Sequence, residues 1–264
     1  MTELDFIRHA LDDMAIVVRA KYAARDGLVV SSKAEANDLL TEVDLAVQAE
    51  LVARIHADFP SDAIYAEESG LNRTPTDLEG RVWLIDPIDG TQNFVRGLFP
   101  AFGISLAFAI NGRPVVGGVA VPGKGELFLA EHGAGAYRNG ERLRVSAIAS
   151  IAHARVEVDF SCPSDRTETL KQFSRLIVET GQIRCHCAAV IGLCSIATGD
   201  MDAFVHVTLN AYDYAAAMVI VEEAGGLLTR LNGDPIHLFD GKPGVLGSNG
   251  LLHAQFFDVI RRVQ

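Results

Sequence analysis

Apolar residues recur at alternating steps of three and four along the first twenty positions of the chain. The stripe consists of Leu4, Ile7, Leu11, Met14 and Val18. Residues at these steps lie on one face of an α-helix, because each turn contains 3.6 residues. The pattern predicts a first amphipathic helix that ends near Gly27.

A second apolar stripe of the same kind follows a polar stretch. It consists of Val43, Val47, Leu51 and Ile55. Asp38 and Thr41 lie just before it, where a capping side chain accepts hydrogen bonds from the first helical turn. Phe59-Pro60 ends the pattern, since the residue before a proline is disfavoured in helical conformation. A second helix is predicted between these limits.

Short β-rich runs replace the helical pattern between Arg81 and Ala130. They cover residues 82–85, 102–109, 115–121 and 126–130. The dipeptides Asn111-Gly112 and Pro122-Gly123 separate some of them, and such dipeptides favour tight turns. Strands joined by tight turns pair antiparallel, so the pattern predicts an antiparallel meander.

The rest of the chain mixes helical and strand-like patterns. Helices are predicted at about 166–180 and 214–224, and Gly225-Gly226 ends the second of them. An apolar segment at 188–197 lies between the two. This half is therefore expected to contain both helices and strands.

A boundary is predicted near residues 140–150, where Asn139-Gly140 and a Ser-rich stretch follow the meander. It divides the chain into an N-terminal half, 1–145, and a C-terminal half, 146–264. No linker composition marks the boundary, so the two halves are expected to share an extended interface.

Composition and charge narrow the class of protein. Hydrophobic residues make up 49% and charged residues 22% of the 264 residues, which is typical of a globular protein. The 23 Lys and Arg are outnumbered by 34 Asp and Glu, and the net charge of -11 argues against a nucleic-acid-binding surface. No apolar run approaches the roughly 20 residues that cross a bilayer, and the N-terminus lacks the pattern of a secretory signal. A cytoplasmic protein without membrane contact is expected.

The cysteines, at positions 162, 185, 187 and 194, show no C-x-x-C spacing. Neither a disulfide framework nor a structural zinc site is indicated by that spacing. Cys185-His186-Cys187 is the one suggestive cluster, but no second ligand pair accompanies it. Small buried residues beside a strand are the alternative interpretation.

The sharpest candidate chemistry lies between Trp83 and Phe94. An apolar strand is expected to end at Asp86, Pro87 to turn the chain, and Asp89-Gly90-Thr91 to follow. Two carboxylates three residues apart can converge on one hard divalent cation, which prefers oxygen ligands. The alternative is a polar turn, because Asp-Pro and Asp-Gly are common in loops.

Three further acids stand at the ends of predicted elements. Glu67 follows the apolar pair Ile64-Tyr65, Asp44 lies in the first turn of the second helix, and Asp213 precedes the helix at 214–224. Each has an ordinary explanation as a turn residue, a residue favoured by the helix dipole, or a cap. Those explanations do not account for the presence of all these acids in one chain.

The combination resembles the inositol monophosphatase family of magnesium-dependent, lithium-sensitive phosphatases. The matching stretches are Asn37 to Asp44, Ala66 to Ser69, Trp83 to Phe94, and Tyr212-Asp213 with Glu223 to Gly226. The resemblance implies an α+β fold, a layered α-β-α-β-α sandwich of the inositol monophosphatase and fructose bisphosphatase type. It also implies a phosphate monoester hydrolase that forms a homodimer.

The same resemblance assigns roles to individual positions. Two or three Mg²⁺ ions, for which Mn²⁺ can substitute, are expected on Glu67, Asp86, the Ile88 carbonyl, Asp89 and Asp213. Asp44 and Thr91, with Glu67, are expected to orient the attacking water, and the backbone of Gly90 and Thr91 to bind the phosphate. Metals are physically required, since five carboxylates and a phosphate of nearly -2 repel one another.

Departures from the family pattern concern the choice of substrate. Inositol-hydrolysing members usually carry Arg-x-x-Gly-(Ser or Thr)-Ala-Ala, whereas this chain has Arg184, Cys187 and Ala188 in a stretch without the hydroxyl. His206 replaces a Glu that accepts hydrogen bonds from ring hydroxyls, unless it is merely a strand-end residue facing solvent. Tyr212 replaces a Trp.

Several functions remain open on these residues. Inositol-1-phosphate or a related polyol phosphate is the first choice of substrate, and histidinol phosphate is the alternative. A non-catalytic partner of the transcription machinery is the alternative of another class, and no basic patch favours it. The residue types near 30 to 36 also suggest a loop that covers the site and brings Lys33 to a metal-bound water.

Overall fold

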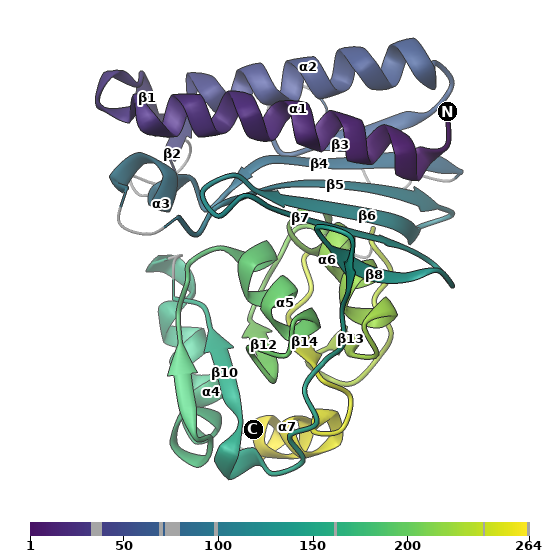
Figure 1. The fold of residues 1–264 in the computed structure, drawn as a ribbon. Coiled ribbons are helices and arrows are strands. Elements are labelled where there is room, and N and C mark those ends of the chain that lie inside the picture. Colours follow the sequence, from purple (N-terminus) through teal and green to yellow (C-terminus); the bar gives the residue numbers. More distant parts are fainter. Residues whose placement is uncertain are drawn as a thin grey trace.

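The computed structural model describes residues 1–32, 39–68, 71, 80–97, 100–160, 163–239 and 241–262. Their helices and sheets stack in the order helix, sheet, helix, sheet, helix (Figure 1). The α-β-α-β-α sandwich expected from the resemblance is therefore present. Nothing within the described ranges is a helix of sufficient length and apolarity to cross a membrane.

Two helices form the first layer. They are α1 (Glu3–Ala23) and α2 (Glu42–Asp58). The predicted stripes are their buried faces, and both helices pack on the first sheet. The α-helical part of α1 stops at Ala23, and a 3₁₀ turn, η1 (Arg25–Gly27), carries the chain to the glycine where the helix was expected to end.

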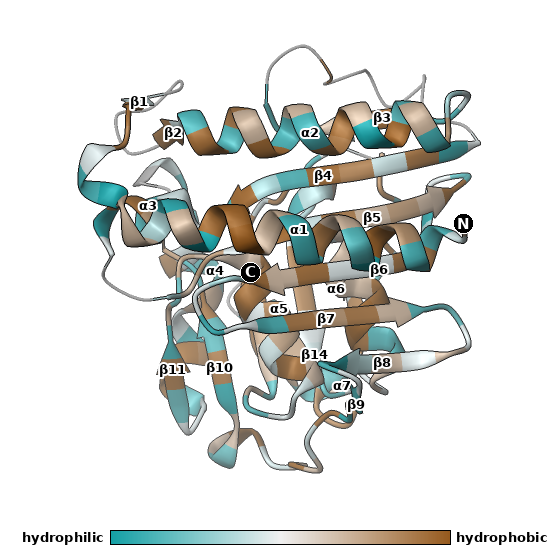
Figure 2. Cartoon of the chain, turned by 45° about the horizontal axis from the view of Figure 1, so that its top comes forward, coloured by the Kyte–Doolittle hydropathy of each residue, from teal (hydrophilic) through white to brown (hydrophobic). Residues whose placement is uncertain are grey.

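The second layer is a seven-stranded sheet. In spatial order its strands are β3 (Ala63–Ala66), β4 (Arg81–Asp89), β5 (Gly103–Ile110), β6 (Arg113–Val121), β7 (Glu126–Glu131), β8 (Gly135–Arg138) and β9 (Glu141–Arg142). The strands from β4 onward pair antiparallel, which confirms the meander, while β3 pairs parallel with β4. Figure 2 shows that β4 to β7 are largely hydrophobic along their length, as a sheet covered on both faces requires.

Strand β4 differs from its expected form in a way that matters for the site. The strand does not end at Asp86 and Pro87 does not turn the chain, since β4 continues to Asp89. Instead, the register with β5 shifts between Asp86 and Asp89. Proline has no N–H to donate to a neighbouring strand, and an irregularity of the β-bulge kind accommodates it and redirects the side chains around it.

The third layer consists of α5 (Ala189–Ala197) and α6 (Ala211–Glu223), which lie between the sheets (Figure 1). The helix predicted at 214–224 thus begins three residues earlier. Helix α6 packs very closely on β6, where a Cβ added at Gly117 would lie 2.3 Å from the Ala216 carbonyl oxygen. The absence of a side chain at Gly117 permits this approach.

The fourth layer is a five-stranded mixed sheet. In spatial order its strands are β11 (Gln182–Arg184), β10 (Arg155–Val158), β12 (Ala203–His206), β14 (Val245–Ser248) and β13 (Leu227–Arg230). Helices α4 (Arg166–Glu179) and α7 (His253–Arg261) form the fifth layer. They share a hydrophobic core with the outer face of this sheet.

The remaining elements are short. They are β1 (Val30–Ser32), β2 (Leu39–Thr41), α3 (Thr91–Arg96), η3 (Ile151–His153) and η4 (Pro163–Asp165). The last strand of the first sheet ends at Arg142, and the first strand of the second sheet begins at Arg155. The division into halves at residue 145 stays a prediction.

Candidate active site

The sheet pairing brings together acids that are far apart in the sequence. Glu67 directly follows β3, and its N–H donates to the Ile85 carbonyl at 3.1 Å, which sets it beside Asp86 on β4. Ser105 is the β5 partner of Asp86, and its hydroxyl donates to the Tyr212 carbonyl at 3.2 Å. The first turn of α6, with Asp213, is thereby held next to the same point.

Asp44 is fixed by the start of α2. Thr41 is the N-cap, and the Asp44 Oδ2 atom accepts hydrogen bonds from the Thr41 hydroxyl and, at 2.9 Å, from the Thr41 N–H. The other oxygen, Oδ1, accepts from the Thr91 hydroxyl at 3.3 Å. Thr91 Oγ1 also lies 2.9 Å from the Ile88 carbonyl oxygen. The capping geometry thus aims one carboxylate oxygen at the Asp86 to Thr91 segment.

Asp213 is held in a similar way, and its alternative interpretation as the N-cap of the helix is wrong. Asn210 is the N-cap of α6, and Asp213 is the third residue of the helix. Its Oδ2 atom accepts from the Asn210 N–H at 2.7 Å. Both helix-borne acids therefore use one oxygen to stabilise a helix start, which orients the carboxylate.

Asp89 connects the first sheet to the middle layer. Its Oδ2 atom accepts from the Val190 N–H, in the first turn of α5, at 2.7 Å. This is a charge-assisted bond between residues 101 positions apart. It ties the helix that follows Cys187 and Ala188 directly to the acidic centre.

The charges of these acids act on one another. Burial raises the pKa of Asp44, Asp86, Asp89 and Asp213, and the charge of Glu67 raises all four further. The pKa values of Asp86 and Asp89 lie well above the usual range, and that of Asp213 is raised to about 7. Without a cation, the group resists full ionisation.

The buried oxygen atoms fit a hard metal ion. Asp86 is 2% exposed, and its Oδ1 atom has no hydrogen-bonding partner in the described part of the chain. A buried carboxylate oxygen without a donor is costly, and divalent cations of the Mg²⁺ type take such oxygens as ligands. Asp86, Asp89, Asp213, Glu67 and the Ile88 carbonyl are the groups available to such an ion.

Gly90 shapes the neighbouring turn. Its φ is +84°, and a Cβ added there would lie 2.9 Å from the Ala101 carbonyl oxygen and 3.0 Å from the Ala188 Cβ. Asn93 secures the same turn, because its amide donates to the carbonyls of Ala101 at 2.7 Å and His186 at 2.6 Å. A residue with a Cβ would therefore not fit at Gly90 in this conformation.

Comparison with known proteins identifies the family. A profile of the family described as "Inositol monophosphatase family" matches residues 1–264. The chain belongs to the inositol monophosphatase family.

Relatives in this family carry more than one name. A protein of Thermotoga maritima named fructose-1,6-bisphosphatase/inositol-1-monophosphatase is 36% identical over 263 residues, which cover 100% of this chain and 97% of the relative. The Nus factor SuhB of Escherichia coli is 33% identical over 228 residues, which cover 85% of this chain and 84% of that protein.

Solved structures of the family have the same fold. The IMPase of Thermotoga maritima superposes with a TM-score of 0.87 at 35% identity, covering 100% of this chain and 98% of the other. The extragenic suppressor protein suhB of Bartonella henselae superposes with a TM-score of 0.89 at 26% identity, and 98% of each chain is covered.

The positions that depart from the family pattern lie in different environments. Arg184 is exposed at the end of β11 and donates to the Ile183 carbonyl and the Gln182 side chain. Ala188 is buried against Gly90. Cys187 has a φ of +55°, in the left-handed region that glycine adopts at no steric cost.

His206 ends strand β12 and is 6% exposed, so it does not face solvent. Its Nδ1 atom accepts from the Thr208 N–H at 3.1 Å. Burial lowers the pKa of His206, and the charges of Asp159 and Asp165 partly offset this effect. The ring is therefore neutral at pH 7, with its other nitrogen protonated because Nδ1 accepts.

Sequence reasoning missed two acids behind the Cys185 to Ala188 segment. Glu157, fully buried in β10, binds the His186 ring and accepts from the His186 N–H at 2.9 Å. Asp159 follows two residues later and lies beside the cysteines. Neither acid belongs to a recognisable motif, and Glu157 meets its partner only through the pairing of β10 with β11.

Some expected features cannot be placed. Asn37, Asp38 and Ser69 of the family motifs lie outside the described residues, as does Lys33 of the expected loop.

Proposed function

We propose that the protein is an Mg²⁺-dependent phosphate monoester hydrolase that acts on inositol-1-phosphate or a related polyol phosphate. The observation that carries the proposal is the acidic centre. Five acids from four separate stretches of the chain converge there, and the charge of Glu67 acts on each of the other four. A structural role does not require this arrangement, because it is electrostatically costly without cations.

Glu67, Asp86, Asp89, Asp213 and the Ile88 carbonyl would hold two or three Mg²⁺ ions, with Mn²⁺ as a substitute. Bound Mg²⁺ supplies charge neutralisation, acidifies a bound water and polarises the phosphoryl oxygens. The chain needs such cations to admit a phosphate at all, because its own carboxylates repel a dianion.

The protein groups then position the reactants. Asp44 and Thr91, whose side chains are 3.3 Å apart, would bind and orient the attacking water, with Asp44 as the acceptor for its proton. The backbone N–H groups at Gly90 and Thr91 would donate to the phosphate, and glycine allows the left-handed turn at position 90 without a clash against Ala101 and Ala188. Water, not a side chain, is the nucleophile.

The choice among substrates depends on a second group of residues. Arg184, Cys187, Ala188 and His206 are the positions proposed to contact the leaving group. A neutral His206 can both donate and accept, whereas the Glu usual at this position only accepts. A polyol phosphate remains the first choice on the family resemblance, and histidinol phosphate remains the alternative.

The test is phosphate release from inositol-1-phosphate, histidinol phosphate, fructose-1,6-bisphosphate and 3'-phosphoadenosine 5'-phosphate, with Mg²⁺ and with excess EDTA. We expect one polyol phosphate to lead and EDTA to stop turnover. Asp89→Asn should lower kcat/KM more than about a hundredfold, since a metal ligand contributes several kcal/mol. Asp58→Asn, an exposed acid at the end of α2, is the matched control and should be fully active. Undiminished activity in EDTA would contradict the proposal.

One observation favours a second candidate function. Several relatives at 33–36% identity are named Nus factor SuhB, so a role as a partner of the transcription machinery is proposed as the alternative. Asp89→Asn separates the two. A binding role survives the loss of one metal ligand, whereas hydrolysis does not.

The proposal includes a cytoplasmic homodimer, as the family resemblance implies. Light scattering after size-exclusion chromatography measures the mass directly. Twice the chain mass of 28.4 kDa is expected, and a mass of one chain at all concentrations would remove the dimer from the proposal.

A further inference from the structure

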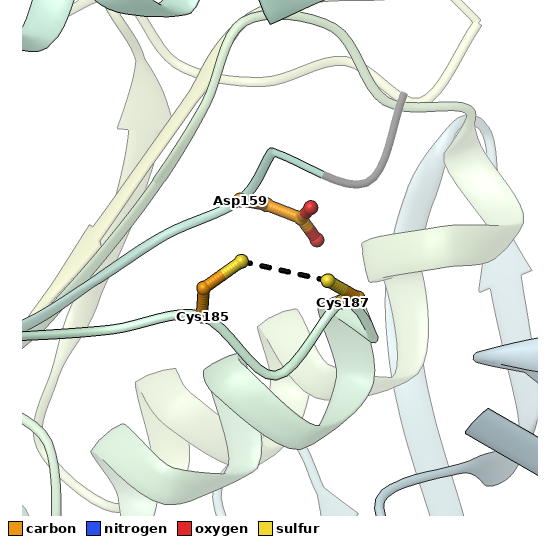
Figure 3. A group of neighbouring side chains, drawn as sticks. All are labelled: Asp159, Cys185 and Cys187. Carbon is orange, nitrogen blue, oxygen red and sulfur yellow. Dashed lines mark hydrogen bonds between the residues drawn. The ribbon is translucent and has the colours of Figure 1, made fainter. Parts of the chain in front are cut away.

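Two thiols and a carboxylate converge at the end of the second sheet. Asp159 follows β10, Cys185 and Cys187 follow β11, and their side chains point toward one another (Figure 3). The sulfur atoms are 3.5 Å apart, and the potential ligand atoms of all three residues lie within 4.8 Å of one another. The parallel pairing of Glu157 with Arg184 brings the two strand ends to the same level.

We propose that Asp159, Cys185 and Cys187 form a binding site for a thiophilic divalent ion, Zn²⁺, separate from the oxygen-lined centre. Zn²⁺ binds thiolates at about 2.3 Å and carboxylates at about 2.0–2.2 Å in tetrahedral geometry. Two thiolates on such an ion lie about 3.8 Å apart, close to the spacing already present between Cys185 and Cys187. The three groups leave a fourth position for water.

The alternative interpretation of the cysteines, as small buried residues beside a strand, does not fit their surroundings. Cys185 is exposed and Cys187 is half-buried, whereas Cys194 is fully buried and has the environment of a packing residue. Cys187 also adopts the left-handed backbone conformation that glycine occupies at no steric cost. A cysteine in such a conformation is better explained by its sulfur than by packing.

Neighbouring groups prepare the site for a metal. His186 lies between the cysteines, but its Nδ1 atom is bound to Glu157, which leaves the sulfur atoms and Asp159 as the convergent ligands. The two sulfur atoms lie 3.5 Å apart, and either thiol can donate a hydrogen bond to the other. Zn²⁺ binding would release the thiol protons to solvent, because the thiolate is the form that binds the metal.

The proposed zinc site adjoins the acidic centre through a short piece of chain. Cys187 precedes Ala188, which packs against Gly90, and the Val190 N–H two residues later binds Asp89. The oxygen-lined centre selects hard cations, and the sulfur-lined site selects soft ones. The two sites would thus bind different ions at the same time.

Calorimetric titration of the intact protein with Zn²⁺ tests the inference. Saturating Mg²⁺ keeps the oxygen site filled, and a phosphine reductant keeps the thiols reduced. We expect one tight Zn²⁺ site in the wild type, with Kd raised at least tenfold by Cys185→Ser and also raised by Asp159→Asn. Cys194→Ala is the matched control, since it removes a thiol elsewhere, and should bind as the wild type does.

Co²⁺ provides a second readout that is specific for sulfur ligands. Thiolate-to-cobalt charge-transfer absorption is expected in the wild type and in Cys194→Ala, and it should be lost in Cys185→Ser. Circular dichroism verifies that each variant is folded, which is expected for Cys185→Ser because the residue is exposed. Zn²⁺ affinity unchanged by Cys185→Ser, or no Zn²⁺ bound under Mg²⁺ saturation, would overturn the proposal. Neither outcome depends on phosphatase activity.

Discussion

Gly90 and Gly140 have the same φ of +84°, but their surroundings differ completely. A Cβ at Gly140 would meet no atom within 4 Å, whereas one at Gly90 would meet the Ala101 carbonyl oxygen at 2.9 Å. Both positions favour glycine for conformational reasons, and only Gly90 also needs it for space. The pair therefore separates backbone strain from crowding at the proposed phosphate site.

Gly90→Ala should cost stability in two ways. The left-handed conformation costs about 1–2 kcal/mol for a residue with a Cβ, and crowding against Ala101 and Ala188 adds about 1–3 kcal/mol. Gly140→Ala has only the first cost. Denaturant unfolding should show the larger loss for Gly90→Ala, together with a fall in kcat/KM that Gly140→Ala lacks. Equal losses in the two variants would contradict the crowding argument.

His206→Glu exchanges a neutral ring for a side chain that, when ionised, only accepts hydrogen bonds. If His206 contacts the leaving group, the variant should change the ranking of substrates more than the rate on a small generic phosphate. The measurement is kcat/KM for inositol-1-phosphate, histidinol phosphate and a generic aryl phosphate. An unchanged ranking would remove His206 from the substrate-selecting residues.

At the level of single elements, the starts of two helices orient the site. Asp44 and Asp213 are each the third residue of a helix, and each directs one oxygen back to the residue at the N-cap. The hydrogen bonds that begin α2 and α6 therefore also limit the rotation of two acids in the proposed metal centre. Capping and the proposed catalysis would be linked through the same carboxylates.

Thr41→Ala tests this link. Removal of an N-cap hydroxyl costs about 0.5–2 kcal/mol of stability. Because Asp44 also loses a hydrogen-bonding partner, we expect kcat to fall by about tenfold, as when a supporting bond in a metal site is removed. Thr2→Ala is the matched control. Thr2 caps α1 and accepts from the Asp5 N–H, so its loss should lower stability without lowering kcat.

At the level of the whole molecule, we expect bound cations to offset the unfavourable contribution of the acidic centre to the stability of the fold. Burial and mutual repulsion raise the pKa of Asp86, Asp89 and Asp213 in the folded state. The folded protein therefore keeps protons that the unfolded chain has released above about pH 4. By linkage, this contribution to the stability of the metal-free protein falls as pH rises from about 4 through the pKa of Asp213 near 7.

Thermal unfolding measures this pH-dependent loss of stability as the difference between the Tm in Mg²⁺ and the Tm in EDTA. Mg²⁺ competes with the retained protons, so the rise in Tm that it produces over EDTA should grow between pH 5 and pH 8. At a concentration a hundred times its Kd, the ion adds about 2.7 kcal/mol. The difference in Tm between the Mg²⁺ and EDTA samples is compared because burial also lowers the pKa of His206 and His253. These two histidines make both samples more stable as pH rises, and their effect cancels in the difference. A shift that does not depend on pH would contradict the coupling.

Local sequence determined much of this protein. The periodicity of apolar residues predicted α1 and α2, and β-rich runs separated by turn dipeptides predicted the β4 to β7 meander, because each of these patterns is local to one element or turn. Four short motifs predicted the family, and with it the candidate acids. The family is confirmed by the comparisons, while the roles of the acids stay predictions.

Tertiary structure decided the features that depend on pairing between strands far apart in the sequence. The β3 strand lies parallel to β4 and so brings Glu67 to Asp86, and the shifted register after Asp86 replaces the predicted turn. The parallel pairing of β10 with β11 joins Asp159 to cysteines more than twenty residues away, which the sequence shows only as an incomplete cluster. Residue spacing describes one element at a time, whereas a site made from several elements depends on how their buried faces pack.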